Sequence, residues 1–206
     1  PLIAKNFIDR DERKFLNQIG LTLRHIVFWS LPAVLLLIVL RAHIVRVILG
    51  AGNFGWLDTR LTAAALALFS LSILIQGLIM LYLRAFYAAE RTFLPLVLAA
   101  FSLFFTVGFA FLFVWLFNNS LNLKNWFEII LRVEGLTGSG MLVLPLSYTL
   151  GGVLNLILLH YYLRREFGLF GGLGFWTPFF QAGFASLIIG GTAFGFLRVF
   201  DNIFNL

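Results

Sequence analysis

The sequence contains no cysteine, and charged side chains make up only 12% of its 206 residues. The absence of cysteine excludes disulfides, thiolate metal ligands and cysteine nucleophiles from this stretch of protein. Soluble domains carry about 25% charged and about 45–50% apolar residues, whereas 61% of these residues are hydrophobic and the mean hydropathy is +0.96. The composition therefore predicts an integral membrane protein.

The net charge is +6, but lysine and arginine sit in short clusters between apolar runs. That pattern is typical of topology signals and of contacts with lipid headgroups, and it does not form the continuous basic stripe that binds nucleic acid. The first residue is Pro1, and residues 1–20 carry no targeting pattern. We therefore expect a piece of a larger membrane protein, with the rest of the same polypeptide as its neighbour.

Five segments are apolar enough to cross the roughly 30 Å of bilayer hydrocarbon, which takes about 20 residues of helix. The predicted fold class is an all-α polytopic membrane protein, a single membrane domain over residues 1–206. Its predicted spans are 23–40, 61–83, 92–117, 141–163 and 179–197.

The connectors between these spans differ in kind. Residues 41–60 begin as a basic helical extension and break at three glycines, so we expect an interfacial or re-entrant turn before Asp58 or Thr59 caps the next helix. Residues 118–140 are polar and predict a short helix on the membrane surface. Its expected apolar positions are Trp126, Ile129, Ile130 and Val133, set against Glu128, Arg132 and Glu134. Residues 168–178 are expected to form a glycine-rich and aromatic interface loop.

Alternating spans divide the basic residues unequally between the two sides of the membrane. One side holds Lys5, Arg10, Arg13, Lys14, Arg24, Arg84, Arg91, Arg164 and Arg165, and the other holds Arg41, Arg46, Arg60, Lys124, Arg132 and Arg198. The positive-inside rule then predicts that the N-terminus and the segment 84–91 lie in the cytoplasm.

Evidence for catalysis is weak. His25, His43 and His160 have no second ligand at helical spacing, and no metal or cofactor site is predicted. The Asp-x-Asp of residues 9–11 could hold Mg²⁺ on a nucleotide-sugar, although a solvated charged loop is the simpler interpretation. Carboxylates near helix ends are explained by local pairing, of Glu90 with Arg91 and of Glu128 with Arg132.

Features of a transporter are more numerous. Pro32 and Pro145 lie inside predicted spans and mark bends, which suit a protein whose helices move. Close helix packing is expected at the pair Gly151-Gly152 and at the GxxxG of residues 191–195. Gln76, Asn155 and Thr106 are uncharged polar groups at membrane depth, which either join helices or line a cavity.

Several short motifs, in this order and spacing, resemble the MviN/MurJ family of lipid II flippases. They are LPA at 31–33, LGAGNF at 49–54 and RAFYA at 84–88, with Asp58, Thr59 and Thr62 after the second and Thr92 and Pro95 after the third. The similarity covers most of residues 1–117 and continues more weakly through the fourth span. The motif residues expected to serve the structure are Pro32, Gly50, Phe54, Asp58, Thr62, Phe86 and Pro95.

The resemblance implies a fold of 14 transmembrane helices in two lobes, part of the multidrug and oligosaccharidyl-lipid exporter superfamily. This chain would supply about helices 9 to 13. It also implies that the protein flips an undecaprenyl-linked peptidoglycan precursor across the bacterial inner membrane by alternating access, with no catalysis. The best-known functional arginines of the family lie in its first, second and eighth helices, which this sequence does not include.

Two departures from the family pattern stand out. The connector 118–140 is longer than the family's usual short loop, and nothing matches the fourteenth helix. Related flippases for other prenyl-linked polysaccharides share the architecture, and a membrane-embedded transferase acting on lipid-linked sugars is the alternative from another class. A cluster of carboxylates around Asp58 and Glu134 would favour the transferase.

Arg84, Tyr87 and Arg91 are the candidate substrate-binding residues. A guanidinium at the end of a long apolar helix can hold a lipid phosphate or pyrophosphate with two parallel hydrogen bonds. The alternative is that Arg84 is a positive-inside anchor, with Phe86 and Tyr87 as part of an aromatic belt. Pro95 is expected in the first turn of the next helix, where its missing N–H leaves no hydrogen bond unmade.

Overall fold

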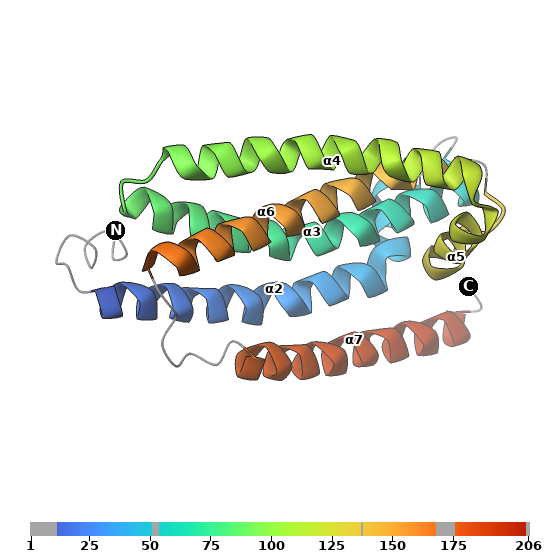
Figure 1. The fold of residues 1–206 in the computed structure, drawn as a ribbon. Helices are drawn as coiled ribbons and strands as arrows, with labels where there is room; N and C mark the ends of the chain where they lie inside the picture. Colours follow the sequence, from blue (N-terminus) through green and yellow to red (C-terminus); the bar gives the residue numbers. More distant parts are fainter. Residues whose placement is uncertain (1–11, 51–53, 137, 168–175, 205–206) are drawn as a thin grey trace.

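A computed structural model describes residues 12–50, 54–136, 138–167 and 176–204, and all regular structure among them is helical (Figure 1). The fold class predicted from the sequence is therefore confirmed. The helices are α2 (Glu12–Leu49), α3 (Trp56–Ala88), α4 (Phe93–Asn119), α5 (Leu121–Leu131), the 3₁₀ helix η1 (Ser139–Leu142), α6 (Val143–Phe167) and α7 (Trp176–Phe204).

Four stretches of the described helices are long and apolar enough to cross a membrane, and they make this a multi-pass membrane protein. They are Asn17–Leu49, Trp56–Ala88, Phe93–Asn119 and Ser139–Glu166. The fifth predicted span, 179–197, lies within α7, whose described apolar stretch Phe180–Phe196 is shorter. α2 runs without a break through Pro32.

The five long helices lie side by side, and consecutive ones run in opposite directions (Figure 1). α2 packs against α3 and α7, while α6 packs against both α3 and α4. The turn from α3 to α4, called here the joint, lies at one end of the bundle, called here the joint end. The short helix α5 lies at the other, called here the α5 end.

Small residues allow α6 to approach two neighbours at once. A Cβ added to Gly151 would lie 2.8 Å from the Thr106 Cβ and closer still to the Thr106 hydroxyl, on α4. A Cβ on Gly152 would lie 3.2 Å from a methyl group of Ile75, on α3. The predicted close packing at this glycine pair is confirmed. The main apolar core lies nearby, where Tyr82, Phe86 and Leu159 pack with Phe15 and Ile19.

The small residues that bring α7 against α2 are not the predicted ones. Ala182 and Ser186 are fully buried, and a Cβ on Gly190 would meet Val39 of α2 at 3.8 Å. Gly191 and Gly195 have no atom within 4 Å of such a Cβ, so the GxxxG prediction for this helix is wrong among the described residues. One residue turns a helix by about 100°, which points these two glycines away from α2.

The connector before α3 corrects another prediction. Gly55, rather than Asp58 or Thr59, is the N-cap of α3. Asp58 lies in the first turn, where its carboxylate accepts a hydrogen bond of 2.9 Å from the Gly55 N–H. This carboxylate satisfies one exposed donor of the helix start, and its charge favours the positive end of the helix dipole. Residues 51–53, within the predicted re-entrant turn, lie outside the described residues.

The short helix predicted in the connector 118–140 exists as α5. Its inward positions are Lys124, Phe127, Glu128 and Leu131, at helical spacing, and Glu128 is buried. The predicted apolar positions Trp126, Ile129 and Ile130 point outward, and only Val133, beyond the helix end, is buried. A contact between distant segments decides this orientation, because Glu128 meets Ser139 of η1.

The close approach at Gly151 gives a prediction for stability. Gly151→Ala should force α4 and α6 apart and lower the free energy of unfolding by about 1–3 kcal/mol, the usual effect of overpacking. Gly108→Ala on α4 is the matched control, since a Cβ there meets nothing within 4 Å. Thermal unfolding of the purified protein in detergent measures both. Equal stability of the two variants would contradict the packing described here.

Candidate functional site

The turn between α3 and α4 has a defined geometry. Glu90 lies in the left-handed region at φ 60°, and the Arg91 N–H donates to the Phe86 carbonyl at 3.0 Å while the Glu90 N–H donates to the Tyr87 carbonyl at 3.1 Å. These two bonds form a Schellman motif that ends α3. The chain then enters α4 through Thr92, its N-cap, and Pro95 lies in the first turn as expected.

The structure separates the three candidate binding residues. Arg84 and Tyr87 are exposed on the last turns of α3. The Arg84 side chain has no hydrogen bond or ion pair within the described part of the chain. Arg91 instead forms an ion pair with Glu166 of α6, with 3.1 Å between Nε and Oε1. Arg91 therefore ties the joint to the end of α6, whereas Arg84 and Tyr87 remain open.

Both local pairings expected from the sequence are wrong. The ion-pair partner of Arg91 is Glu166 rather than its neighbour Glu90. Glu128 lies 3.9 Å from the Lys124 ammonium and accepts a hydrogen bond of 2.6 Å from the Ser139 hydroxyl. Arg132 is the C-cap of α5 and lies in the left-handed region at φ 58°. Because its backbone is no longer helical, the i, i+4 geometry expected for a pair with Glu128 is absent.

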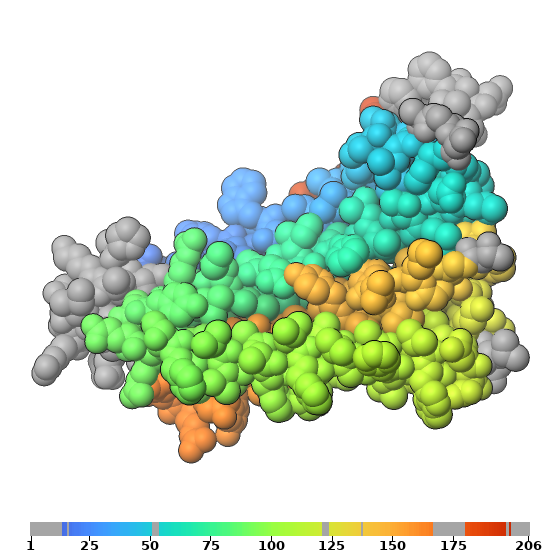
Figure 2. All heavy atoms as spheres, turned by 90° about the horizontal axis from the view of Figure 1, so that it is seen from above, coloured from blue at the N-terminus to red at the C-terminus, as the bar shows by residue number. Residues whose placement is uncertain are grey.

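Arg84 and Tyr87 belong to a straight exposed stripe, called here the open face of α3. Its members recur at intervals of three or four residues, which places them on one side of the helix. They are Phe69, Ile73, Gln76, Met80, Arg84 and Tyr87. At 1.5 Å per residue the stripe is about 27 Å long, close to the hydrocarbon thickness of a bilayer. Figure 2 shows α3 uncovered between α2 and α4, with part of α6 beside it.

A polar contact from α6 lies midway along this face. The Gln76 side-chain amide donates to the Tyr148 hydroxyl at 3.0 Å, and the Tyr148 ring lies edge-on to Phe69 with 5.9 Å between ring centroids. The sequence identified Gln76 as a polar group at membrane depth but missed Tyr148. The available signal was a phenol three residues after Pro145, between Ser147 and Thr149 in the most polar of the four spans.

The outward surface of α4 is different in character. Its exposed positions from Phe93 to Trp115 are all apolar, and they include Phe101, Phe104 and Phe111. Surfaces that face lipid tails carry no polar groups, whereas polar side chains in membrane proteins face the bundle interior or a water-filled cavity. The contrast assigns the α4 surface to lipid and favours a polar surrounding for the open face of α3.

In the part of the chain that the structure describes, the other titratable groups are spread over separate contacts. The Tyr82 hydroxyl lies 2.9 Å from Nδ1 of His160, a contact that joins α3 and α6. Among the described residues, no group of three or more histidine and acidic side chains could hold a metal ion. The predicted sign of a transferase was a carboxylate cluster around Asp58 and Glu134. Asp58 accepts a hydrogen bond from the Gly55 N–H, and Glu134 is exposed with no hydrogen bond or ion pair to another described residue, so the described residues give the transferase no support. The Asp-x-Asp of residues 9–11 lies outside the described residues.

Comparison with known families gives a match for this sequence. The family model described as lipid II flippase MurJ matches residues 1–205. The chain belongs to the MurJ family. A search of curated proteins and a search of solved structures each found no match. The members of the MurJ family are membrane transporters that move lipid II, and the resemblance first noted in short motifs extends over nearly the whole chain.

Four of the motif positions, Gly50, Asp58, Phe86 and Pro95, have defined contacts or are fully buried. Gly50 ends α2 and donates to the Arg46 carbonyl at 2.9 Å, and a Cβ at this position would collide with that carbonyl. Phe86 and Pro95 are fully buried at the joint, and the Asp58 carboxylate accepts the hydrogen bond from the Gly55 N–H at the start of α3. The remaining motif residues, Pro32, Phe54 and Thr62, are half-buried.

The contrast between the two faces gives a prediction about water access. Cysteine placed at Met80 should react with a membrane-impermeant maleimide, because the polar groups Gln76, Tyr148 and Arg84 favour water beside the open face. Cysteine at Phe104, on the lipid-facing side of α4, should react at least ten times more slowly. The full-length protein, freed of any other cysteine, is labelled in membrane vesicles. Similar rates at the two positions would show that both faces meet the same surroundings.

Proposed function

We propose that the protein moves lipid II across the bacterial inner membrane by alternating access. The observation that carries the proposal is the open face of α3. It extends over about the thickness of the hydrocarbon layer and carries polar groups only at mid-height, at Gln76 and Tyr148, and at the joint end, at Arg84 and Tyr87. An amphipathic lipid with an anionic head matches that distribution.

Arg84 is the group proposed to receive the pyrophosphate. Its guanidinium presents a planar set of donors that suits two parallel hydrogen bonds to phosphate oxygens. It has no partner in the described part of the chain that would compete. Tyr87, one turn further, adds a hydroxyl beside it. Arg91 has a different proposed role, as the anchor that fixes the joint to Glu166.

The transport cycle follows from the amphipathic character of the substrate. The sugar-pyrophosphate head moves along the polar side of the bundle, while the prenyl chain stays in lipid. The rest of the same polypeptide supplies the opposing wall, and rocking of the two lobes exposes the head to one side and then to the other. The joint end is proposed to lie in the cytoplasm, as the positive-inside rule predicts.

Replacement of a resident flippase tests this function. The full reading frame is expressed in a bacterial strain depleted of its own lipid II flippase, and viability and lipid II translocation are scored. We expect both to be restored. If a well-expressed and correctly inserted protein restores neither, the proposal fails, and a flippase for another prenyl-linked polysaccharide precursor becomes the leading candidate.

Arg84→Ala should reduce lipid II translocation about 10- to 100-fold, the effect of losing a charged hydrogen bond of about 1.5–3 kcal/mol. Arg165→Ala is the matched control, because Arg165 is an exposed arginine at the same end of the bundle. If both variants transport alike, Arg84 is only a membrane anchor. Surface expression of each variant is measured alongside, so that poor insertion is not taken for lost transport.

A further inference from the structure

The C-terminal end of α5 is held by two arginines from other helices. Arg60 of α3 donates to the Arg132 carbonyl from Nε at 3.1 Å and also from Nη2. Arg41 of α2 donates to the Leu131 carbonyl at 3.3 Å. The last carbonyls of a helix are its negative end, so two guanidinium groups are favourable partners there. This end of α5 is fixed to both α2 and α3.

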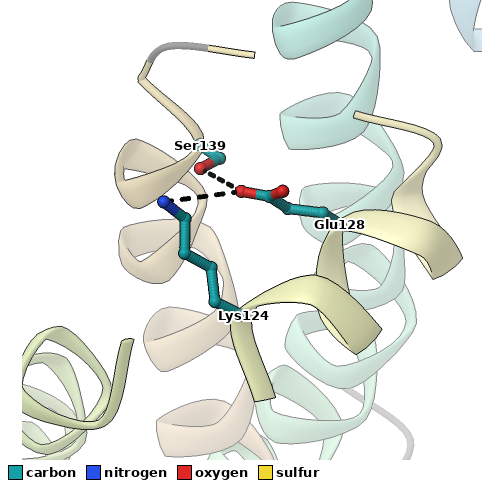
Figure 3. Close-up of polar contacts among 3 residues, drawn as sticks. All are labelled: Lys124, Glu128 and Ser139. Carbon is teal, nitrogen blue, oxygen red and sulfur yellow. Dashed lines mark hydrogen bonds and ion pairs between the residues drawn. The ribbon is translucent and has the colours of Figure 1, made fainter. Parts of the chain in front are cut away.

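The inward side of α5 is fixed as well. Figure 3 shows one oxygen of the Glu128 carboxylate, Oε1, meeting both the Ser139 hydroxyl, at 2.6 Å, and the Lys124 ammonium, at 3.9 Å. A buried carboxylate without such partners would be costly, so this contact favours one rotation of the helix. Leu131 and Val133 add apolar contacts with a cluster that includes Ala64 and Leu142.

This rotation leaves an uncharged surface outward. Trp126, Ile129 and Ile130 form it, and 64%, 56% and 54% of their surfaces are exposed. They are called here the α5 apolar face. Asn125, beside them, is also exposed and uncharged. These three side chains offer an apolar area on the order of a few hundred Å², which is less than the roughly 800 Å² per partner of a stable protein interface.

Other tryptophans indicate the depth of this face in the membrane. Trp56 begins α3 and Trp115 lies one turn before the end of α4, so both are at the α5 end, and both are 61% exposed. The guanidinium of Arg46 lies 5.5 Å from the centre of the Trp56 ring. Tryptophan and arginine side chains collect at the level of the lipid headgroups. α5 packs onto this level directly, with 5.2 Å between the rings of Phe117 and Phe127.

We propose that the α5 apolar face is a lipid-binding surface. Trp126, Ile129 and Ile130 insert into the boundary between headgroups and acyl chains on the side of the membrane where α5 lies. The contacts of Arg41, Arg60 and Glu128 hold the helix parallel to that boundary. A short amphipathic helix of this kind seats its apolar side a few ångströms into the lipid. The proposal depends on the multi-pass architecture and is independent of the transported substrate.

Spin labelling of the full-length protein tests this surface. Single cysteines replace Trp126, Ile130 or Glu134, one at a time, in a background without other cysteines, and each carries a nitroxide. The proteins are reconstituted into phosphatidylethanolamine and phosphatidylglycerol vesicles. Power saturation then compares collisions with oxygen, which partitions into lipid, and with a water-soluble nickel chelate. Glu134 is the control, an exposed residue in the turn after α5.

Labels at Trp126 and Ile130 should collide several times more with oxygen than with nickel, and the label at Glu134 should show the reverse. Two outcomes would overturn the proposal. Nickel access at Trp126 and Ile130 equal to that at Glu134 would place the face in water. Low access to both reagents would mean that another protein segment covers it. Two labelled positions on the face keep the test decisive if one variant fails to insert.

Discussion

The close packing of α6 between α3 and α4 is the contact on which the other features depend. Helices inside a bilayer gain no hydrophobic free energy by associating, because lipid tails are as apolar as their side chains. Dispersion contacts at short range, and hydrogen bonds, must hold them together. The adjacent glycines Gly151 and Gly152 face different neighbours, Thr106 on α4 and Ile75 on α3. This pair therefore sets both the rotation and the height of α6.

The remaining contacts of α6 follow from that position. Near its start, the Thr149 hydroxyl donates to the Leu68 carbonyl at 3.1 Å, and Tyr148 reaches Gln76. At its end, Glu166 meets Arg91. The 3₁₀ helix before α6 brings Ser139 to Glu128 and so orients α5. One helix thus connects the joint end, the middle of the open face and the α5 end, which makes α3, α4, α5 and α6 a single packed unit.

The fold was largely predictable because it depends on local properties of the sequence. Long runs without charge require helices in a membrane, since only a helix satisfies its own backbone groups there. The errors concern which side of a helix meets which neighbour. α7 has two small-residue stripes offset by one position, Ala182-Ser186-Gly190 and the pair Gly191 and Gly195, and only the first faces α2. Periodicity alone cannot choose between them.

The same limit applies to α5 and to the candidate site. The sequence predicted that Trp126, Ile129 and Ile130 lie on one side of α5, but it paired Glu128 with Arg132. In the structure Glu128 instead meets Lys124 and, from another segment, Ser139. The sequence identified Gln76 and Arg84 individually. It could not show that they lie on one stripe with Tyr148 beside them, because Tyr148 comes from α6 and reaches that face only through the packing at Gly151 and Gly152.

The hydrogen-bonding capacity of Gln76 argues for what surrounds the open face of α3. A glutamine amide has two N–H donors and an acceptor oxygen, and in the described residues a single bond, to Tyr148, uses one of the donors. Leaving such groups unpaired in an apolar medium costs roughly 2–7 kcal/mol. Water or a polar substrate removes that cost. The exposed apolar surface of α4 carries no comparable group, so contact with lipid leaves no hydrogen-bonding group unpaired there. The two faces of the bundle therefore suit two different surroundings, which agrees with the proposed movement of an amphipathic lipid along the open face.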